Sequence, residues 1–148
     1  MFPSSLLVQV NLYNSNDIIH GLGGDDVIFG LGGDDRLYGD DGNDILFGNA
    51  GNNILTGGSG ADIFALSSDG FSRVMDFNVC EGDRIGLTDG LTVDRLSFET
   101  SVTAKGSTTW ISDRLTNQRL MELPGITSTT LTQSLFVPIS SQINGYCH

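Results

Sequence analysis

Apolar residues return at every ninth position between Leu12 and Ala65, and the positions between them are rich in glycine and aspartate. Each nine-residue unit has six mostly polar residues followed by three with an apolar centre. A degenerate unit without glycine begins at Leu12, and the full units begin at Gly21, Gly30, Gly39, Gly48 and Gly57. A fixed period of this kind indicates a solenoid, because one unit cannot bury its own apolar residues and must stack on its neighbours.

Three columns of the unit carry the structural information. Glycine holds the first and fourth places of every full unit, where a tight turn needs a positive φ or a close backbone approach. The eighth place is an inward apolar position, occupied by Ile19, Ile28, Leu37, Leu46, Leu55 and Phe64. The sixth place carries a carboxylate in every unit but one, and its residues are Asp17, Asp26, Asp35, Asp44, Asn53 and Asp62.

This alternation of turns and short apolar runs predicts two short strands in every eighteen residues. If each strand stacks in parallel on the strand one coil away, the chain forms an all-β, right-handed parallel β-roll (solenoid) of two sheets. Successive turns then lie on opposite edges of the roll. We call them the Asp44 edge, with Asp26, Asp44 and Asp62, and the Asp35 edge, with Asp17, Asp35 and Asn53.

Carboxylates stacked along these edges favour a bound cation. Neighbouring strands lie about 4.8 Å apart, and carboxylates at that spacing repel each other strongly unless a cation lies between them. Ca²⁺ takes a variable number of oxygen ligands from carboxylates and turn carbonyls, whereas Mg²⁺ needs a near-ideal octahedron and keeps its waters. The sequence therefore predicts several calcium ions, held between the pairs Asp26/Asp44, Asp44/Asp62, Asp17/Asp35 and Asp35/Asn53.

The five full units resemble the nonapeptide G-G-x-G-x-D-x-U-x of the RTX (repeats-in-toxin, hemolysin-type calcium-binding) family. The stretch from Asp69 to Leu87 is similar to the D-x-I-x-D-F-x-x-G-x-D-x-I-x-L segment that often follows such repeats. This chain departs from the family pattern at Asn53 and in the second place, which reads Leu22, Leu31, Asp40 and Asn49. The resemblance implies a calcium-binding β-roll, for which the predicted ligands are Asp17, Gly21, Gly23, Asp26, Gly30, Gly32, Asp35, Gly39, Asp41, Asp44, Gly48, Asn53 and Asp62.

The charge balance predicts a switch in folding. The net charge is −11, and between Asp17 and Asp62 nine acidic residues face a single base, Arg36. Without a cation such a glycine-rich, self-repelling segment has the composition of a disordered chain, and with a cation the binding free energy becomes folding free energy. An acidic linker that binds nothing is the alternative, but a linker has no need of an aliphatic column in register. The acidic balance also argues against nucleic acid, whose phosphates require Lys and Arg.

Targeting signals are sparse in the sequence. Residues 1–10 lack the basic region and the apolar length of a Sec signal peptide, and no stretch is long enough to span a membrane. The resemblance implies export through a type I ABC exporter guided by an uncleaved C-terminal signal, and the apolar run 131–137 suits such a signal. We therefore expect an extracellular protein. Cys80 and Cys147 are too few for a disulfide framework.

Beyond Ala65 the repeat stops and alternating runs at 91–98 and 108–123 predict strands, the second run being a hairpin with its turn at 114–117. We expect a β-rich C-terminal cap over the open end of the roll, with a small core of Trp110, Ile111, Leu120, Met121 and Leu123. The predicted organisation is a lead-in (1–11), the β-roll (12–65), the cap with its candidate secretion signal (66–137) and a flexible tail (138–148).

The seventh and ninth places point outward, so each sheet has an outer face. One is mixed, with Ile18, His20, Arg36, Tyr38, Ile54 and Thr56. The other, which we call the apolar outer face, consists of Val27, Phe29, Ile45, Phe47, Ile63 and Ala65. A patch of this size normally marks a contact. We expect it to be covered, either by the C-terminal strands around Trp110 and Leu120 or by self-association with a second copy.

The sequence offers no catalytic constellation. The histidines are His20 and His148 and there is no H-E-x-x-H motif, so zinc-protease chemistry has no ligands. Gly58-Ser59-Gly60 lacks the strand-to-helix elbow of a serine hydrolase, and the run 40–44 lacks the glutamate that closes an EF-hand. We expect a calcium-binding protein without enzymatic activity. The alternative is a targeting or adhesion module, or a fragment of a toxin or a larger secreted enzyme such as a hydrolase or epimerase.

Overall fold

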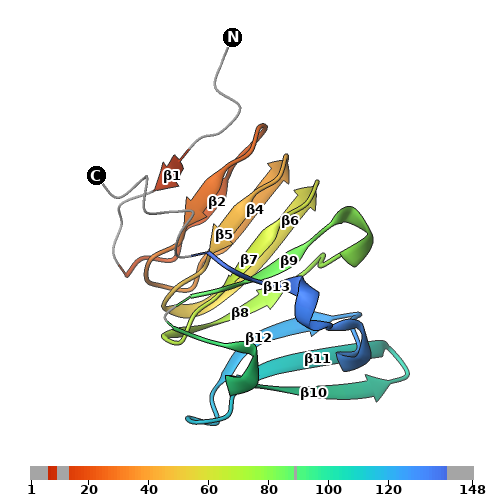
Figure 1. The fold of residues 1–148 in the computed structure, drawn as a ribbon. Helices are drawn as coiled ribbons and strands as arrows, with labels where there is room; N and C mark the ends of the chain where they lie inside the picture. The colour runs from red at the N-terminus through yellow and green to blue at the C-terminus, as the bar shows by residue number, and fades with distance from the viewer. Residues whose placement is uncertain (1–6, 10–13, 89, 140–148) are drawn as a thin grey trace.

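A computed structural model gives the fold of residues 7–9, 14–88 and 90–139. These residues form β-strands joined by turns and short 3-10 helices (Figure 1). The strands of the first half are β1 (Leu7–Gln9), β2 (Ile18–His20), β3 (Val27–Phe29), β4 (Arg36–Asp41), β5 (Ile45–Phe47), β6 (Gly51–Ser59), β7 (Ile63–Leu66), β8 (Gly70–Val74) and β9 (Arg84–Leu87). The later strands are β10 (Leu96–Thr103), β11 (Gly106–Asp113), β12 (Arg119–Pro124) and β13 (Phe136–Pro138). The 3-10 helices are η1 (Val79–Glu81), η2 (Val93–Arg95), η3 (Ser128–Thr130) and η4 (Gln133–Leu135). Within the described ranges there is no helix long and apolar enough to cross a membrane.

The strands form two sheets that stack coil on coil. One sheet has the order β1-β3-β5-β7-β9-β13, and the other has the order β2-β4-β6-β8-β12-β11-β10. In the repeats every strand pairs in parallel with the strand eighteen residues away, so that Ile18 lies beside Arg36 and Val27 beside Ile45. The predicted fold class, an all-β parallel β-roll with a β-rich C-terminal cap, is confirmed.

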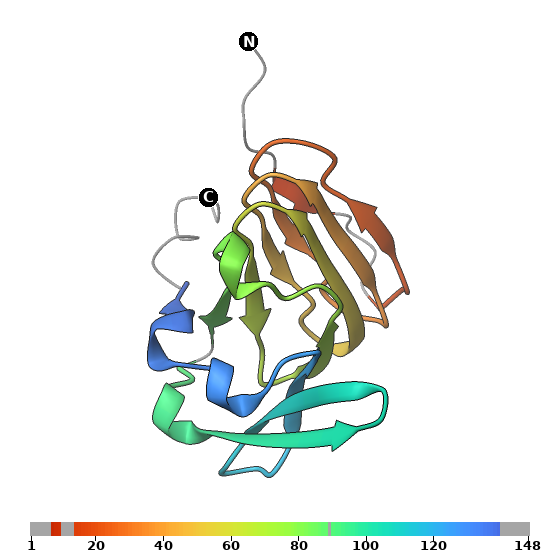
Figure 2. The same cartoon turned by 90° about the vertical axis from the view of Figure 1, so that its right-hand side faces the viewer.

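Parallel stacking continues beyond the last repeat. Strand β8 pairs with β6 and β9 pairs with β7, and then β12 and β13 add in parallel to β8 and β9. Strands β10, β11 and β12 pair antiparallel and lie across the C-terminal end of the roll (Figure 2). The cap therefore shares both of its sheets with the roll. The boundary between roll and cap at residue 65 stays a prediction, made from the point where the sequence repeat ends.

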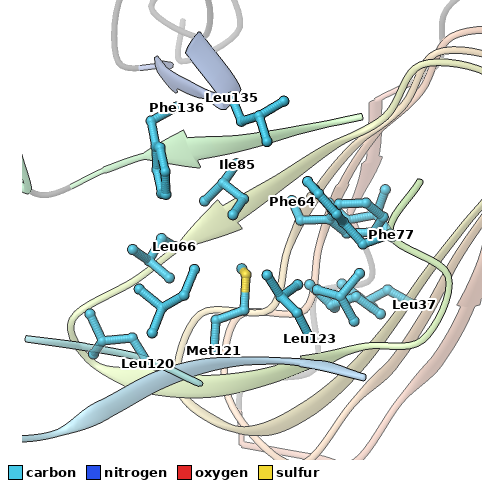
Figure 3. Close-up of a cluster of buried hydrophobic side chains, with 14 of the residues drawn as sticks. Leu37, Phe64, Leu66, Phe77, Ile85, Leu120, Met121, Leu123, Leu135 and Phe136 are labelled. Carbon is cyan, nitrogen blue, oxygen red and sulfur yellow. The ribbon is translucent and has the colours of Figure 1, made fainter. Parts of the chain in front are cut away.

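A single core runs through the roll and into the cap. The eighth-place side chains from Ile28 to Phe64 are fully buried between the sheets. Figure 3 shows Met121 and Leu123 from the cap on one side of Ile85, with Leu135 on its other side. Ile111, Leu120, Met121 and Leu123, expected to form a small core in the cap, are buried as part of this common core, because β12 extends a sheet of the roll.

Two further expectations about the cap need correction. Trp110 is not a core residue, since it is half-buried and the Arg119 guanidinium lies 4.6 Å from its ring centroid. The alternating run 91–98 is a strand only from Leu96, because η2 occupies residues 93–95. The hairpin of the second run is present as β11 and β12.

The apolar outer face is covered only in part, and not by the strands around Trp110 and Leu120. Val27, Phe47 and Ala65 are buried in one cluster with Ile139, which follows β13, whereas Phe29, Ile45 and Ile63 are half-buried. The strands around Trp110 and Leu120 are in the other sheet. Of the predicted flexible tail, Pro138 ends β13 and Ile139 is fully buried, and residues 140–148 lie outside the described residues, as does most of the predicted lead-in.

Candidate metal centre

The sixth-place carboxylates brace one coil against the next. Oδ1 of Asp44 accepts a hydrogen bond from the backbone N–H of Asp26 at 2.7 Å, and Oδ1 of Asp62 accepts one from Asp44 at 2.9 Å. On the opposite edge Oδ1 of Asp35 accepts from the N–H of Asp17 at 2.9 Å. Each side chain therefore reaches back to the turn one coil earlier, and one of its two oxygens is used in doing so.

The other oxygen is left without a protein partner. In the described structure Oδ2 of Asp35, of Asp44 and of Asp62 is buried and has no hydrogen bond. Buried polar atoms nearly always have a partner, and an ion is one recognised reason for an apparent exception. An unsatisfied carboxylate oxygen repeated at three turns of the same sequence pattern has the position expected of a metal ligand.

Burial also makes these carboxylates costly to ionise. Desolvation raises the pKa of Asp44 to about 7, and the negative charges of Asp62, Asp26 and Asp25 add to the effect. Desolvation likewise raises the pKa of Asp62 to about 6. The negative charges of nearby acids raise it further, and the charge of Asp83 contributes most among them. A cation beside these carboxyls would lower their pKa values instead, because an opposite charge nearby favours the ionised carboxylate.

The first-place glycines leave room beside each of these oxygens. A Cβ on Gly21 would lie 2.6 Å from Oδ2 of Asp26 and 2.7 Å from the carbonyl oxygen of Gly39. At Gly39 a Cβ would overlap Oδ2 of Asp44 and would lie 2.5 Å from the carbonyl oxygen of Gly57. A carboxylate oxygen and a carbonyl oxygen from the next coil thus converge on a space that only glycine keeps open.

The chemistry of these donors fits calcium. In the described ranges no group of three or more His, Cys, Asp or Glu side chains converges on one point. An ion at these edges would therefore take backbone carbonyls as its other ligands. A donor set made only of oxygens, with carbonyls supplementing one or two carboxylates, suits Ca²⁺ and does not suit zinc, which prefers nitrogen and sulfur.

The structure brings most of the predicted ligands into this arrangement. Buried first-place glycines stand next to the sixth-place side chains on both edges, at Gly21, Gly30, Gly39 and Gly48. Asp17 lies at the end of its edge, is only half-buried, and accepts a hydrogen bond from the Ser15 hydroxyl at 3.1 Å. Its site is therefore less enclosed than those of Asp44 and Asp62.

The third-place residues are placed differently. The side chain of Asp41 is exposed and accepts a hydrogen bond from the Ser59 hydroxyl at 2.8 Å. Gly23 is exposed, whereas Gly32 is buried beside Asn14. Any contribution of these three residues to a metal site would come through their backbone carbonyls, and it remains a prediction.

A second ladder of side chains, in the fifth place of the unit, adds to the edges. Its carbonyl or carboxylate oxygens accept backbone N–H groups of the next coil at 2.8 Å: Asn16 from Asp34, Asp25 from Asn43, Asp34 from Asn52, and Asn43 from Ala61. The fifth-place side chains reach forward, while the sixth-place side chains reach back. Each turn is therefore held from both directions. The signal in the sequence is the column of Asn and Asp in that place.

Two acids beyond the repeats complete the Asp44 edge. Oδ1 of Asp83 accepts from the N–H of Asp62 at 2.9 Å and so continues the ladder, while its Oδ2 accepts from the N–H of Asn78 at 2.8 Å. Asp76 accepts the N–H groups of Gly57 and Gly58, both at 2.8 Å. Both acids belong to the segment that resembles the family's post-repeat stretch. Because both oxygens of Asp83 are used, the row of unpartnered oxygens ends at Asp62.

A parallel β-roll whose edges carry buried carboxylates beside glycine carbonyls defines the class of calcium-binding repeat proteins. A family model described as the RTX calcium-binding nonapeptide repeat (four copies) matches residues 13–46 and 38–69. The chain belongs to this RTX family, whose nonapeptide repeats bind calcium, and its several repeats imply several ions. No protein among the curated ones gives a significant sequence match.

Solved structures agree with this assignment. The solution structure of the AlgE6R3 subunit from the Azotobacter vinelandii mannuronan C5-epimerase is 30% identical in sequence, with a TM-score of 0.62. The match covers 86% of this chain and 81% of that one. The solution structure of the AlgE6R2 subunit of the same enzyme is 24% identical in sequence, with a TM-score of 0.57. The match covers 92% of each of the two chains, and at this identity it supports only the similarity of fold.

Proposed function

We propose that this chain is a non-catalytic, secreted module that folds when its edges bind calcium outside the cell. One observation carries the proposal: the buried Oδ2 atoms of Asp35, Asp44 and Asp62 have no protein partner in the described structure. An ionised carboxylate in that position is costly in the calcium-free fold and is compensated when a cation binds. Calcium would therefore stabilise the folded chain far more than the unfolded one.

Low cytosolic calcium would keep the chain unfolded, which suits threading through a type I exporter. Calcium outside the cell would then drive folding after export. Two observations support this order of events. The repeats carry nine acids against one base, so the calcium-free chain repels itself. The family to which the chain belongs implies this route of secretion.

The test is a calcium titration of the whole chain followed by far-ultraviolet circular dichroism. We expect β structure to appear at about 10⁻⁴ to 10⁻³ M calcium, the range of extracellular calcium modules. Magnesium at the same concentrations serves as the control and should give much less change, because it keeps its waters and tolerates fewer carbonyl ligands. A spectrum that stays constant up to several millimolar calcium, with no heat of binding, would refute the proposal.

A second candidate is an accessory module of a larger enzyme. It is favoured by the 30% identity to a subunit of a mannuronan C5-epimerase over most of that subunit's length. The discriminating assay incubates the calcium-loaded chain with mannuronan and follows the polymer by proton magnetic resonance. Epimerisation would make the chain an enzyme, polymer binding without conversion would favour an accessory module, and neither would leave the calcium-dependent fold as the function.

A further inference from the structure

Asn53 is the single sixth-place residue that is not an aspartate, and its side chain has one fixed orientation. Its Oδ1 accepts the backbone N–H of Asp35 at 2.9 Å, which is the bond that Asp44 makes to Asp26 on the opposite edge. If the amide were rotated by 180°, its NH₂ group would face the backbone N–H of Asp35. Both groups are donors, so this orientation would lose the hydrogen bond. The amide nitrogen Nδ2 therefore takes the place that Oδ2 takes in the aspartates.

That nitrogen lies in the space left open by the first-place glycine. A Cβ on Gly48 would come within 2.7 Å of Nδ2 of Asn53, just as a Cβ on Gly21 would come within 2.6 Å of Oδ2 of Asp26. The nitrogen is a donor, and it donates to the carbonyl of Asn49 at 3.2 Å and more weakly to that of Ala50 at 3.5 Å. The 48–53 turn therefore satisfies its own buried side chain and two of its own carbonyls.

The next coil also differs at this turn. Beside Gly39, the oxygen from the next coil is the carbonyl of Gly57. Beside Gly48, it is the hydroxyl of Ser72, which lies 2.7 Å from the point that a Cβ would occupy. Ser72 is buried on β8, directly beside Asn53 on β6. The turn around Asn53 thus lacks the carboxylate oxygen of the Asp44 turn, and a serine hydroxyl lies where that turn has a glycine carbonyl.

We propose that Asn53 closes its turn with its own amide nitrogen at the position where the aspartate turns hold calcium, so that the 48–53 turn binds no ion. An amide NH₂ cannot ligate a cation, because its hydrogens point toward the ion and its lone pair is delocalised. The carbonyls of Asn49 and Ala50 are already used by the amide. This inference rests on the proposed calcium sites and specifies which turn does not share them.

Two consequences follow for the roll. The two edges respond differently to calcium, because the Asp44 edge has aspartate at all three turns and the Asp35 edge has an ion-free turn. The 48–53 turn is also joined to the preceding coil by the hydrogen bond from the Asp35 N–H to Oδ1 of Asn53, which needs no ion.

The test exchanges the amide for a carboxylate with Asn53→Asp. This variant should bind one additional calcium ion per chain, measured by equilibrium dialysis with radioactive calcium. In a calcium chelator it should unfold at lower urea than the wild type, because the new carboxylate would face the carbonyls of Asn49 and Ala50 without a cation. The matched control is Asn52→Asp, which adds the same charge one residue away at an exposed fifth-place position. The control should keep the wild-type stoichiometry.

The outcomes separate this inference from the proposed function. If the wild type binds calcium but Asn53→Asp binds no more ions than Asn52→Asp, the inference about Asn53 is overturned and the function stands. If the wild type binds none, both are overturned. The reverse exchange, Asp44→Asn, keeps the chain near its wild-type shape and guards against misfolding of the first variant. It should lose at least one ion while keeping a β spectrum at high calcium, and an unchanged stoichiometry would count against the inference.

Discussion

Replacing Asp44 with alanine should raise the calcium concentration required for folding by about tenfold or more, since a loss of about 1.4 kcal/mol corresponds to a factor of ten. Asp44 lies at the middle turn of its edge and is fully buried. In the proposed ladder it would serve the ion shared with Asp26 and also the ion shared with Asp62. Asp17→Ala is the comparison, because Asp17 lies at the end of the other edge and would serve a single ion.

The magnitude follows from what each side chain contacts. The substitution at Asp44 removes a buried acceptor 2.7 Å from the N–H of Asp26. Loss of a hydrogen bond to a charged group costs about 1.5–3 kcal/mol. The loss of a carboxylate ligand adds to this, so tenfold is a lower bound. Asp17→Ala removes a hydrogen bond from Ser15 that is only half-buried, together with a ligand of one less enclosed ion, so its midpoint should move less than that of Asp44→Ala.

The assay is the calcium midpoint of the far-ultraviolet circular dichroism signal at pH 8 and fixed ionic strength. Asp94→Ala controls for the change in net charge, because Asp94 is exposed on η2, away from the repeat edges. Its midpoint should match that of the wild type. Equal midpoints for Asp44→Ala and Asp17→Ala would refute a ladder in which the middle carboxylate is shared.

Two further predictions concern pH and backbone strain. Calcium affinity should fall about tenfold from pH 8 to pH 6, because Asp44, with a pKa of about 7, is about one-tenth ionised at pH 6. In a chelator the sign reverses. Folding raises the pKa of the Asp44 and Asp62 carboxyls, so β structure should be greatest below about pH 4 and should decline as pH rises through about 7. A far-ultraviolet circular dichroism signal that instead grows with pH would contradict the burial of Asp44 and Asp62. Leu22→Gly should stabilise the calcium-loaded fold by about 0.5–1 kcal/mol. Leu22 is exposed and has a φ of 77°, and this left-handed conformation costs a non-glycine residue about 1–2 kcal/mol. Glycine avoids that cost, and the extra backbone entropy that it loses on folding is smaller, about 0.5–1 kcal/mol. The control is Leu115→Gly, an equally exposed leucine without a positive φ, which should give no gain in urea unfolding.

The repeat region could be predicted from the sequence because its period allows a single stacking. With eighteen residues in each coil, Leu37 lies beside Ile19 and Leu55 beside Leu37, and all three are buried. A shift of one residue would turn this column to the outside. The same register places the sixth-place side chains in line, so the period that predicts the fold also predicts the candidate site.

The coil after the repeats could not be predicted in the same way, because its spacing is irregular. Arg73 pairs with Ile54, and Arg84 pairs with Ile63 at a separation of 21 residues rather than 18. The extra residues form η1, and with them the nine-residue pattern is lost. What remains is the local run Asp83-Arg84-Ile85, in which Asp83 continues the ladder and Ile85 is fully buried.

Other features depend on geometry that spacing alone does not contain. The column of Asn and Asp in the fifth place is visible in the sequence, yet nothing in it says that Asn43 reaches forward to Ala61 while Asp44 reaches back to Asp26. Ile139 joins the buried cluster of the apolar outer face, although it lies far beyond the repeats and directly after Pro138. A single residue has no period, so its partners cannot be derived from a pattern.

The two ladders also explain why calcium can control folding without setting the register. The hydrogen bonds made by Asn43 and by Oδ1 of Asp44 connect coils through backbone N–H groups and require no ion. The buried Oδ2 of Asp44 is different, because its ionised form is destabilised until a cation is present. The register therefore comes from the sequence repeat, and the ion determines whether that register is stable. At Asn53 the amide oxygen makes the same hydrogen bond to the preceding coil, and the uncharged amide nitrogen donates within its own turn, so we infer that this turn is exempt from control by calcium.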